Sequence, residues 1–86
     1  MQKIEESQNI VNRFFACLDR LKEENYIRGF QTFTRKYNIN KRNFYTIRKN
    51  PSSGMFEVGW LQYLVLDYGV SPTWLLTGRG VMFNEK

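Results

Sequence analysis

The segment from Phe30 to Asn50 most constrains the fold of this chain, because its pattern is that of two short helices joined by a tight turn. At a step of about 100° per residue, residues 30–37 place apolar side chains on one side of a helix and polar ones on the other. Asn38 can end this helix, since asparagine tolerates the left-handed backbone conformation better than any residue except glycine. Asn40 is a good N-cap for a second helix over residues 41–49. We therefore expect two helices that share a small apolar corner.

The second of these helices has two chemically different faces. Phe44 and Ile47 fall on one face and can pack into a core. The opposite face carries cationic and hydrogen-bonding side chains, namely Arg42, Tyr45, Thr46 and Lys49, with Lys41 at its edge. Two short helices with such an outer face have the plan of a helix-turn-helix that binds DNA.

The positive charge of the chain is concentrated on this two-helix segment. The chain has 13 basic and 8 acidic residues and a formal net charge of +5. Between Asn25 and Phe56 there is no acidic residue, whereas seven basic residues occur there. Such a segment favours a polyanionic partner, although a merely solvated basic face would have the same composition.

Composition excludes several classes of protein. A chain of 86 residues has room for one domain with one core. It contains no histidine and one cysteine, Cys17, so we expect no metal site, no cofactor and no nucleophile–histidine catalysis, and we do not expect an enzyme. No apolar run is long enough to span a bilayer and no leader peptide is evident, so we expect no membrane partner and a cytoplasmic location.

The residues before the central segment predict a first helix over residues 7–24. Ser7 can serve as its N-cap, and apolar residues recur at three- and four-residue steps behind it. Cys17 lies on this apolar stripe and is expected to be a small buried side chain.

Two helices are expected after the central segment. The first covers residues 56–68 and ends before Gly69, which suits a left-handed residue after a helix. The second covers residues 72–77 and is bracketed by Ser71 as N-cap and by Gly78. Between residues 49 and 56 the Asn-Pro-Ser-Ser-Gly stretch is a loop, which can lie along a phosphate backbone or serve only as a connection.

This order of five helices resembles the λ-repressor-like helix-turn-helix domains of phage repressors and related bacterial regulators, over most of the chain. That family has a large apolar residue, a small residue, three positions, glycine, an aliphatic residue and a polar cap. The corresponding residues here are Phe33-Thr34 and Asn38-Ile39-Asn40. The segment from Ser71 to Phe83 (SPTWLLTGRGVMF) also looks like the closing segment of short repressors of this type.

Two departures from the family pattern affect the turn. Thr34 stands where alanine is usual, and Asn38 stands where glycine is usual. We expect the Thr34 hydroxyl to bond to a backbone carbonyl one turn earlier in its own helix.

The resemblance implies a compact all-α, five-helix domain over residues 1–86 whose third helix enters the major groove of double-stranded DNA. The expected base contacts are Lys41, Arg42, Tyr45 and Thr46. Arg42 could bind guanine through two hydrogen bonds, and Thr46 and the Tyr45 ring could pack on a thymine methyl group. The expected phosphate contacts are Gln31, Arg35, Asn43, Arg48, Lys49, Ser52 and Ser53.

The resemblance also implies a transcriptional regulator, such as a bacterial, phage or mobile-element repressor, that binds a palindromic operator as a homodimer. Apolar residues near the C-terminus lack an evident partner within so small a domain. The candidates for the dimer interface are Trp74, Leu75, Val81, Met82 and Phe83.

Two other functions are compatible with the sequence. The surface from Trp74 to Phe83 could bind a partner protein, with DNA binding weak or lost. Tyrosine and phenylalanine alternating with lysine and arginine could instead stack the bases of RNA or single-stranded DNA. Against that mode, the helical wheel buries most of these rings and leaves chiefly Tyr45 exposed.

Overall fold

The computed structural model describes residues 3–84 of the chain, and the named elements of secondary structure in this range are all helices. Its five helices are α1 (Lys3–Glu23), α2 (Phe30–Lys36), α3 (Lys41–Lys49), α4 (Gly59–Tyr68) and α5 (Pro72–Thr77). The expected all-α fold with five helices is therefore confirmed. Among the described helices, none is long and apolar enough to cross a membrane.

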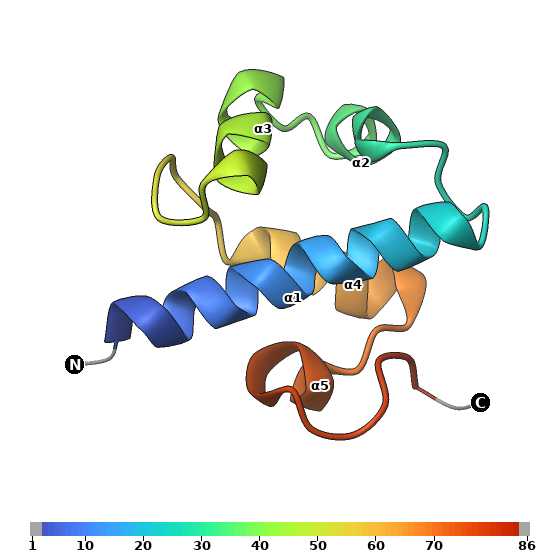
Figure 1. The fold of residues 1–86 in the computed structure, drawn as a ribbon. Helices are drawn as coiled ribbons and strands as arrows, with labels where there is room; N and C mark the ends of the chain where they lie inside the picture. The colour runs from blue at the N-terminus through green and yellow to red at the C-terminus, as the bar shows by residue number, and fades with distance from the viewer. Residues whose placement is uncertain (1–2, 85–86) are drawn as a thin grey trace.

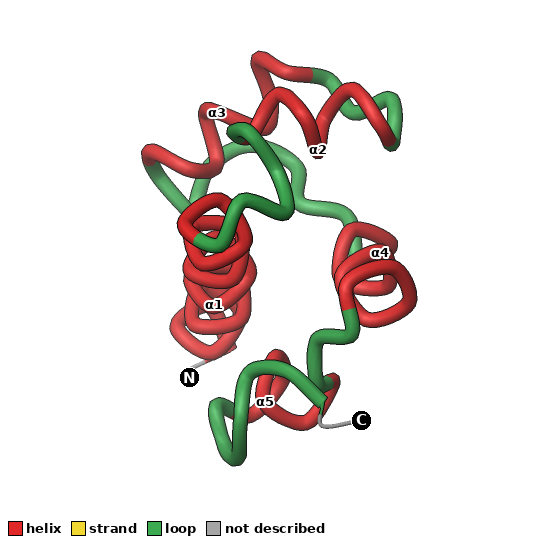
Figure 2. The backbone as a smooth tube through the Cα atoms, turned by 90° about the vertical axis from the view of Figure 1, so that its right-hand side faces the viewer, coloured by secondary structure: helices red, strands yellow, loops and turns green. Residues whose placement is uncertain are grey.

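The helices surround one core (Figures 1 and 2). In Figure 1, α2 and α3 lie on one side of α1 and α5 lies on the other. Figure 2 looks nearly along α1 and places α4 across the centre from it. Side chains from different helices fill this centre, and Phe14, Phe33, Phe44 and Leu64 are completely buried.

Edge-to-face aromatic contacts join α1 to the two-helix unit formed by α2 and α3. The Phe14 ring on α1 lies 5.7 Å from Phe33 on α2 and 6.0 Å from Phe44 on α3, both in T-shaped arrangements. Such pairs stabilise by about 0.5–1.5 kcal/mol beyond the area that they bury. The aromatic residues therefore fix the positions of α2 and α3 against α1.

The first helix begins earlier than predicted. Ser7 lies inside α1, which starts at Lys3, so Ser7 is not its N-cap. Residues 3–6 (Lys-Ile-Glu-Glu) contain no helix breaker, and the helix continues through them. Farther along, Cys17 is completely buried, as expected, and this burial raises the pKa of its thiol to about 12.

The fourth helix begins later than predicted, at Gly59 instead of residue 56. Phe56 lies in the preceding loop, but its ring still reaches the core, 5.2 Å from Phe14 and 4.9 Å from Trp60. The spacing of this apolar residue therefore fits a helix, although Phe56 itself is not helical. The helix end is as predicted, because Gly69 adopts φ 71°.

The C-terminal segment folds back on the helices. Ser71 accepts a hydrogen bond from the backbone amide of Trp74, and Gly78 adopts φ 80°, which confirms the expected caps of α5. After α5, Phe83 forms an antiparallel bridge with Val70, and the Ser71 amide donates to the Met82 carbonyl at 2.8 Å. The tail thus packs on its own chain, which the sequence did not indicate.

Candidate nucleic-acid interface

The turn between α2 and α3 has the predicted geometry. Asn38 adopts φ 56°, in the left-handed region. The amide of Ile39 donates to the Thr34 carbonyl at 2.8 Å, and the Asn40 side chain caps α3 by accepting from the Asn43 amide at 2.8 Å. Asparagine at these two positions therefore supplies both the left-handed residue and the N-cap.

Thr34 is buried at the contact between α2 and α3, with 4% of its surface exposed. Its hydroxyl donates to the Gln31 carbonyl at 3.3 Å, one turn earlier, as predicted. This bond satisfies the polar group, so a threonine is accommodated where the resembling family has alanine.

Tyr37 ties the end of α2 to α4. Its hydroxyl donates to Oδ2 of Asp67 at 2.5 Å, and its ring stacks on Tyr63 with centroids 3.9 Å apart. Burial, followed by the hydrogen bond to Asp67, raises the pKa of Tyr37. Together with the Phe14 contacts, this tie holds the two-helix unit on the rest of the domain.

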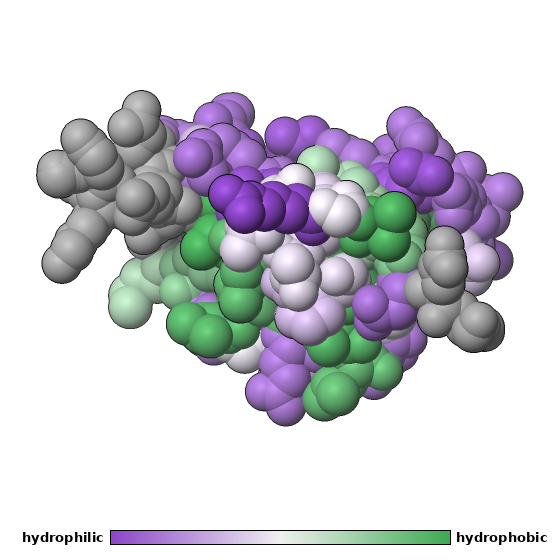
Figure 3. Space-filling view, turned by 90° about the horizontal axis from the view of Figure 1, so that it is seen from below, coloured by the Kyte–Doolittle hydropathy of each residue, from purple (hydrophilic) through white to green (hydrophobic). Residues whose placement is uncertain are grey.

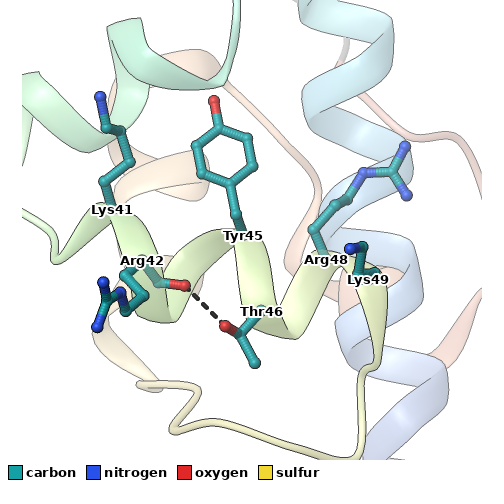
Figure 4. A pocket seen from close by; sticks show the side chains of 6 residues that line it. All are labelled: Lys41, Arg42, Tyr45, Thr46, Arg48 and Lys49. Atoms are coloured by element: carbon teal, nitrogen blue, oxygen red, sulfur yellow. Dashed lines mark hydrogen bonds between the residues drawn. The ribbon is translucent and has the colours of Figure 1, made fainter.

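One face of α3 anchors it, and the other is open to solvent. Phe44 and Ile47 are completely buried, as predicted. Six side chains line an open hollow along the outer face (Figure 4): Lys41, Arg42, Tyr45, Thr46, Arg48 and Lys49. Five of them carry a charge or a donor at the end of a flexible chain or ring, so the face is cationic and rich in hydrogen-bond donors.

The outer face is divided into two rows by the helical repeat. Arg42, Thr46 and Lys49 form the outermost row, almost opposite Phe44 and Ile47. Lys41, Tyr45 and Arg48 form the second row, which leans toward α1 and α2 (Figure 4). Among the side chains that the structure describes, no carboxylate lies within ion-pair distance of Lys41, Arg42 or Lys49.

Two members of the second row pack against the domain. The Tyr45 side chain is 40% exposed, and its ring lies 6.1 Å from the ring of Phe30. The Arg48 guanidinium lies 3.5 Å from Oδ2 of Asp19 and covers the rings of Phe15 and Phe30 at 5.8 and 5.5 Å. Arg48 is thus engaged with α1 and is less free than Lys49 to meet a phosphate.

The outermost row contains one internal hydrogen bond. The Thr46 hydroxyl donates to the backbone carbonyl of Arg42 at 2.9 Å (Figure 4). Both side chains are exposed. The Arg42 guanidinium extends away from the helix (Figure 4).

The loop after α3 is held against the helix by Asn43. The Asn43 side chain donates to the Met55 carbonyl and accepts from the Met55 amide, each at 2.9 Å. Gly54, at φ 78°, lies so close that an added Cβ would meet Ile47 at 2.6 Å. The side chain of Asn43, expected as a phosphate contact, therefore holds the loop against α3.

The serines of this loop bond to the loop itself. Both the amide and the hydroxyl of Ser52 donate to the Asn50 side chain, and the Ser53 hydroxyl donates to the Asn50 carbonyl. Their oxygens keep lone pairs, but the hydroxyl protons are occupied. The two remaining expected phosphate contacts, Gln31 and Arg35, are exposed on α2.

The candidate dimer residues differ in exposure. Leu75 is 1% exposed and lies in the core of its own chain, so, contrary to expectation, it offers almost no surface to a second copy. Trp74, Met82 and Phe83 are half-buried against the core, whereas Val81 is 60% exposed. Figure 3 views the molecule from the α5 side and shows hydrophobic patches between hydrophilic residues.

Sequence reasoning missed several contacts on this side of the molecule. Leu76, which is 51% exposed, faces outward next to the buried Leu75 and was not among the expected interface residues. Arg13 on α1 donates to the carbonyls of Leu75 and Leu76 at 2.8 and 2.9 Å. No local sequence signal indicates this bond, because 62 residues separate Arg13 from Leu75.

A small apolar groove between α4 and α5 adjoins these residues. It is lined by Val58, Gly59, Leu61, Gln62, Val65, Pro72, Leu75 and Leu76, none of which is charged. Val58, at its margin, is 77% exposed.

In the described part of the chain, no three His, Cys, Asp or Glu side chains are grouped as metal ligands would be.

Comparisons of this chain with protein-family models, with characterised proteins and with solved structures found no match. The assignment of a function therefore depends on the geometry of α3, on the charges of its outer face and on the physical chemistry of these groups. The strongest of these features is an outer face that is cationic and open to solvent, on a helix whose inner face is fixed in the core.

Proposed function

We propose that this protein is a sequence-specific regulator of transcription that inserts α3 into the major groove of double-stranded DNA, as λ-repressor-like helix-turn-helix proteins do. The observation that carries the proposal is the exposed cationic face of α3, opposite the buried Phe44 and Ile47. Because Phe44 and Ile47 anchor α3 in the core, the domain presents these side chains in a defined geometry. A defined geometry is what readout of base edges needs.

The dimensions of α3 support this mode of binding. The helix has nine residues, and an α-helix with its side chains is about 10–12 Å in diameter. The major groove of B-form DNA is about 12 Å wide and admits one helix. A helix whose outer face is open to solvent can present its side chains to such a groove.

The proposed contacts divide into two classes. Arg42 and Thr46 in the outermost row, with Lys41 and Tyr45 beside them, contact base edges. Lys49 at the end of α3, with Gln31 and Arg35 on α2, contacts phosphates and sets the register of the protein on the duplex. Arg48 chiefly anchors α3 to α1, because Asp19 and two aromatic rings already hold it.

We also propose that the protein binds a palindromic operator as a homodimer. One module of this size buries a limited area of DNA, so two copies on mirrored half-sites would supply the affinity of a repressor. The exposed Leu76 and Val81, with the uncharged groove between α4 and α5, are the proposed surface for the second copy.

The proposal is tested by selecting duplexes from a random pool and footprinting the protein on the winner. The expected result is an enriched site with mirrored half-sites whose centres are about 34 Å apart, one helical turn. Arg42→Ala should lose affinity by about 1–3 kcal/mol on this site and much less on unrelated duplexes. Failure to bind any duplex at low ionic strength would contradict the proposal.

A further inference from the structure

Thr46 presents a methyl group, and no hydroxyl proton, to whatever faces α3. A threonine hydroxyl has one proton, and that of Thr46 is donated to the Arg42 carbonyl at 2.9 Å. The methyl group on the same Cβ points away from the helix (Figure 4). Thr46 therefore has no donor to offer to a base, and its outward group is apolar.

The position of this methyl group is central in the outermost row. Arg42 lies one turn before Thr46 and Lys49 lies one turn after it, so a small apolar spot stands between two long cationic side chains. On the adjacent row, the Tyr45 ring leans toward Phe30, with the ring centroids 6.1 Å apart, and not over Thr46. A ligand that reaches the middle of the α3 face thus meets the Thr46 methyl group.

Only one apolar group projects from base edges into the major groove, the 5-methyl group of a pyrimidine. We infer that Thr46 recognises a 5-methylated pyrimidine, thymine in ordinary DNA, in each half-site. This inference rests on the proposed function and specifies what the same site reads.

The distance between Thr46 and Arg42 sets where this pyrimidine lies. Side chains four residues apart on a helix have Cβ atoms about 5–6 Å apart. Successive base pairs are stacked about 3.4 Å apart along a strand. The methylated pyrimidine therefore lies within about two base pairs of the base that Arg42 contacts.

The competing reading is that Thr46 uses its oxygen. The oxygen keeps a lone pair that could accept a proton from the amino group of cytosine or adenine. The two readings are separable, because replacing thymine by deoxyuridine removes only the methyl group and leaves every donor and acceptor in place.

The experiment measures the affinity of the protein for the duplex selected from the random pool and for copies with deoxyuridine at single thymine positions. We expect the affinity to fall by about threefold to tenfold at one position in each half-site, which corresponds to the loss of one buried methyl group. Deoxyuridine outside the half-sites is the control and should change nothing.

Two variants assign the effect to Thr46. Thr46→Ser keeps the hydroxyl and removes the methyl group, so it should bind the thymine and deoxyuridine duplexes equally. Thr46→Val keeps a methyl group and removes the hydroxyl, so it should still discriminate between them. Circular dichroism of each variant establishes that α3 is intact.

The outcomes distinguish this inference from the proposed function. If a selected duplex binds and Arg42→Ala weakens it, but no deoxyuridine position matters, the methyl inference is wrong while the function stands. The inference is also overturned if Thr46→Ser retains the full discrimination or Thr46→Val abolishes it. If no duplex is bound at all, both proposals fail.

Discussion

The side chain of Asn43 holds the backbone of Met55 through two hydrogen bonds of 2.9 Å, one donated and one accepted. The bonds join the first turn of α3 to the loop that follows it, 12 residues farther along the chain. Because an asparagine amide has both a donor and an acceptor, it can pair with a peptide group as a neighbouring strand would. The loop and α3 are thereby fixed relative to each other.

Asn43→Ala should lower the free energy of unfolding by about 1–2 kcal/mol, since two hydrogen bonds are lost and the loop is released. Urea denaturation measures the change. Asn12→Ala, at an exposed site on α1, is the matched control and should stay within about 0.5 kcal/mol of the parent. Equal effects of the two substitutions would show that the Asn43 bonds do not stabilise the fold.

Gly54→Ala should be more destabilising than Gly80→Ala. Both glycines have a positive φ, 78° and 85°, so each substitution costs about 1–2 kcal/mol in backbone energy. Only at Gly54 would the new Cβ also meet packed atoms, with Ile47 at 2.6 Å and Asn43 Oδ1 at 2.9 Å. The extra cost should be about 1–3 kcal/mol, measured by thermal or urea unfolding. A smaller loss at Gly54 than at Gly80 would contradict the packing described here.

Lys49→Ala and Arg48→Ala should differ in how salt affects DNA binding. Lys49 is free to neutralise a phosphate, so its loss should weaken binding to all duplexes and reduce the slope of log affinity against log salt by about 0.9. Arg48 is held by Asp19, so its loss should act mainly on the stability of the protein. Fluorescence anisotropy at several salt concentrations measures both slopes. Identical changes in slope would show that Arg48 also meets the DNA backbone.

The stability that Cys17 contributes should fall in alkaline solution. Burial raises the pKa of this thiol from 9.0 to about 12 in the folded chain. Between these values the unfolded thiol loses its proton while the folded thiol keeps it, so ionisation favours unfolding. The free energy of unfolding of the parent should therefore drop relative to that of Cys17→Ala as the pH rises above 9. A constant difference from pH 7 to 10.5 would show that the thiol is not protected.

Leu76→Asp should weaken self-association if the α5 side forms the dimer interface. Leu76 is 51% exposed beside the uncharged groove, and a carboxylate there would be costly to bury against a second copy. Sedimentation velocity over a range of concentrations measures the effect. Tyr26→Asp, at a 67% exposed position between α1 and α2, is the control and should leave the association unchanged. A parent protein that stays monomeric at high concentration would remove the basis for this interface.

Much of the α2–α3 unit could be predicted from the sequence because its determinants are local. The left-handed Asn38, the N-cap Asn40 and the buried Phe44 each depend on residues within one or two turns. The caps of α5 were predictable for the same reason. The helical repeat also sufficed to place the outward side chains of α3.

Contacts between distant segments could not be predicted in this way. Arg48 pairs with Asp19 on α1, and the sequence contains no signal for this pair. The roles of Leu75 and Leu76 depend on how α5 is rotated against α1, which neighbouring residues do not determine. Phe56 has the spacing of a helical residue but reaches the core from a loop. Such features arise from tertiary packing, which overrides local preference.

Methylation interference on the selected duplex tests most directly whether α3 reads the major groove. N7 of guanine lies in the major groove, whereas N3 of adenine lies in the minor groove. Methylation of N7 at one guanine in each half-site should block binding, and Arg42→Ala should abolish this sensitivity. Binding that tolerates N7 methylation at every guanine, or that is blocked only by methylation of adenine N3, would contradict insertion of α3 into the major groove.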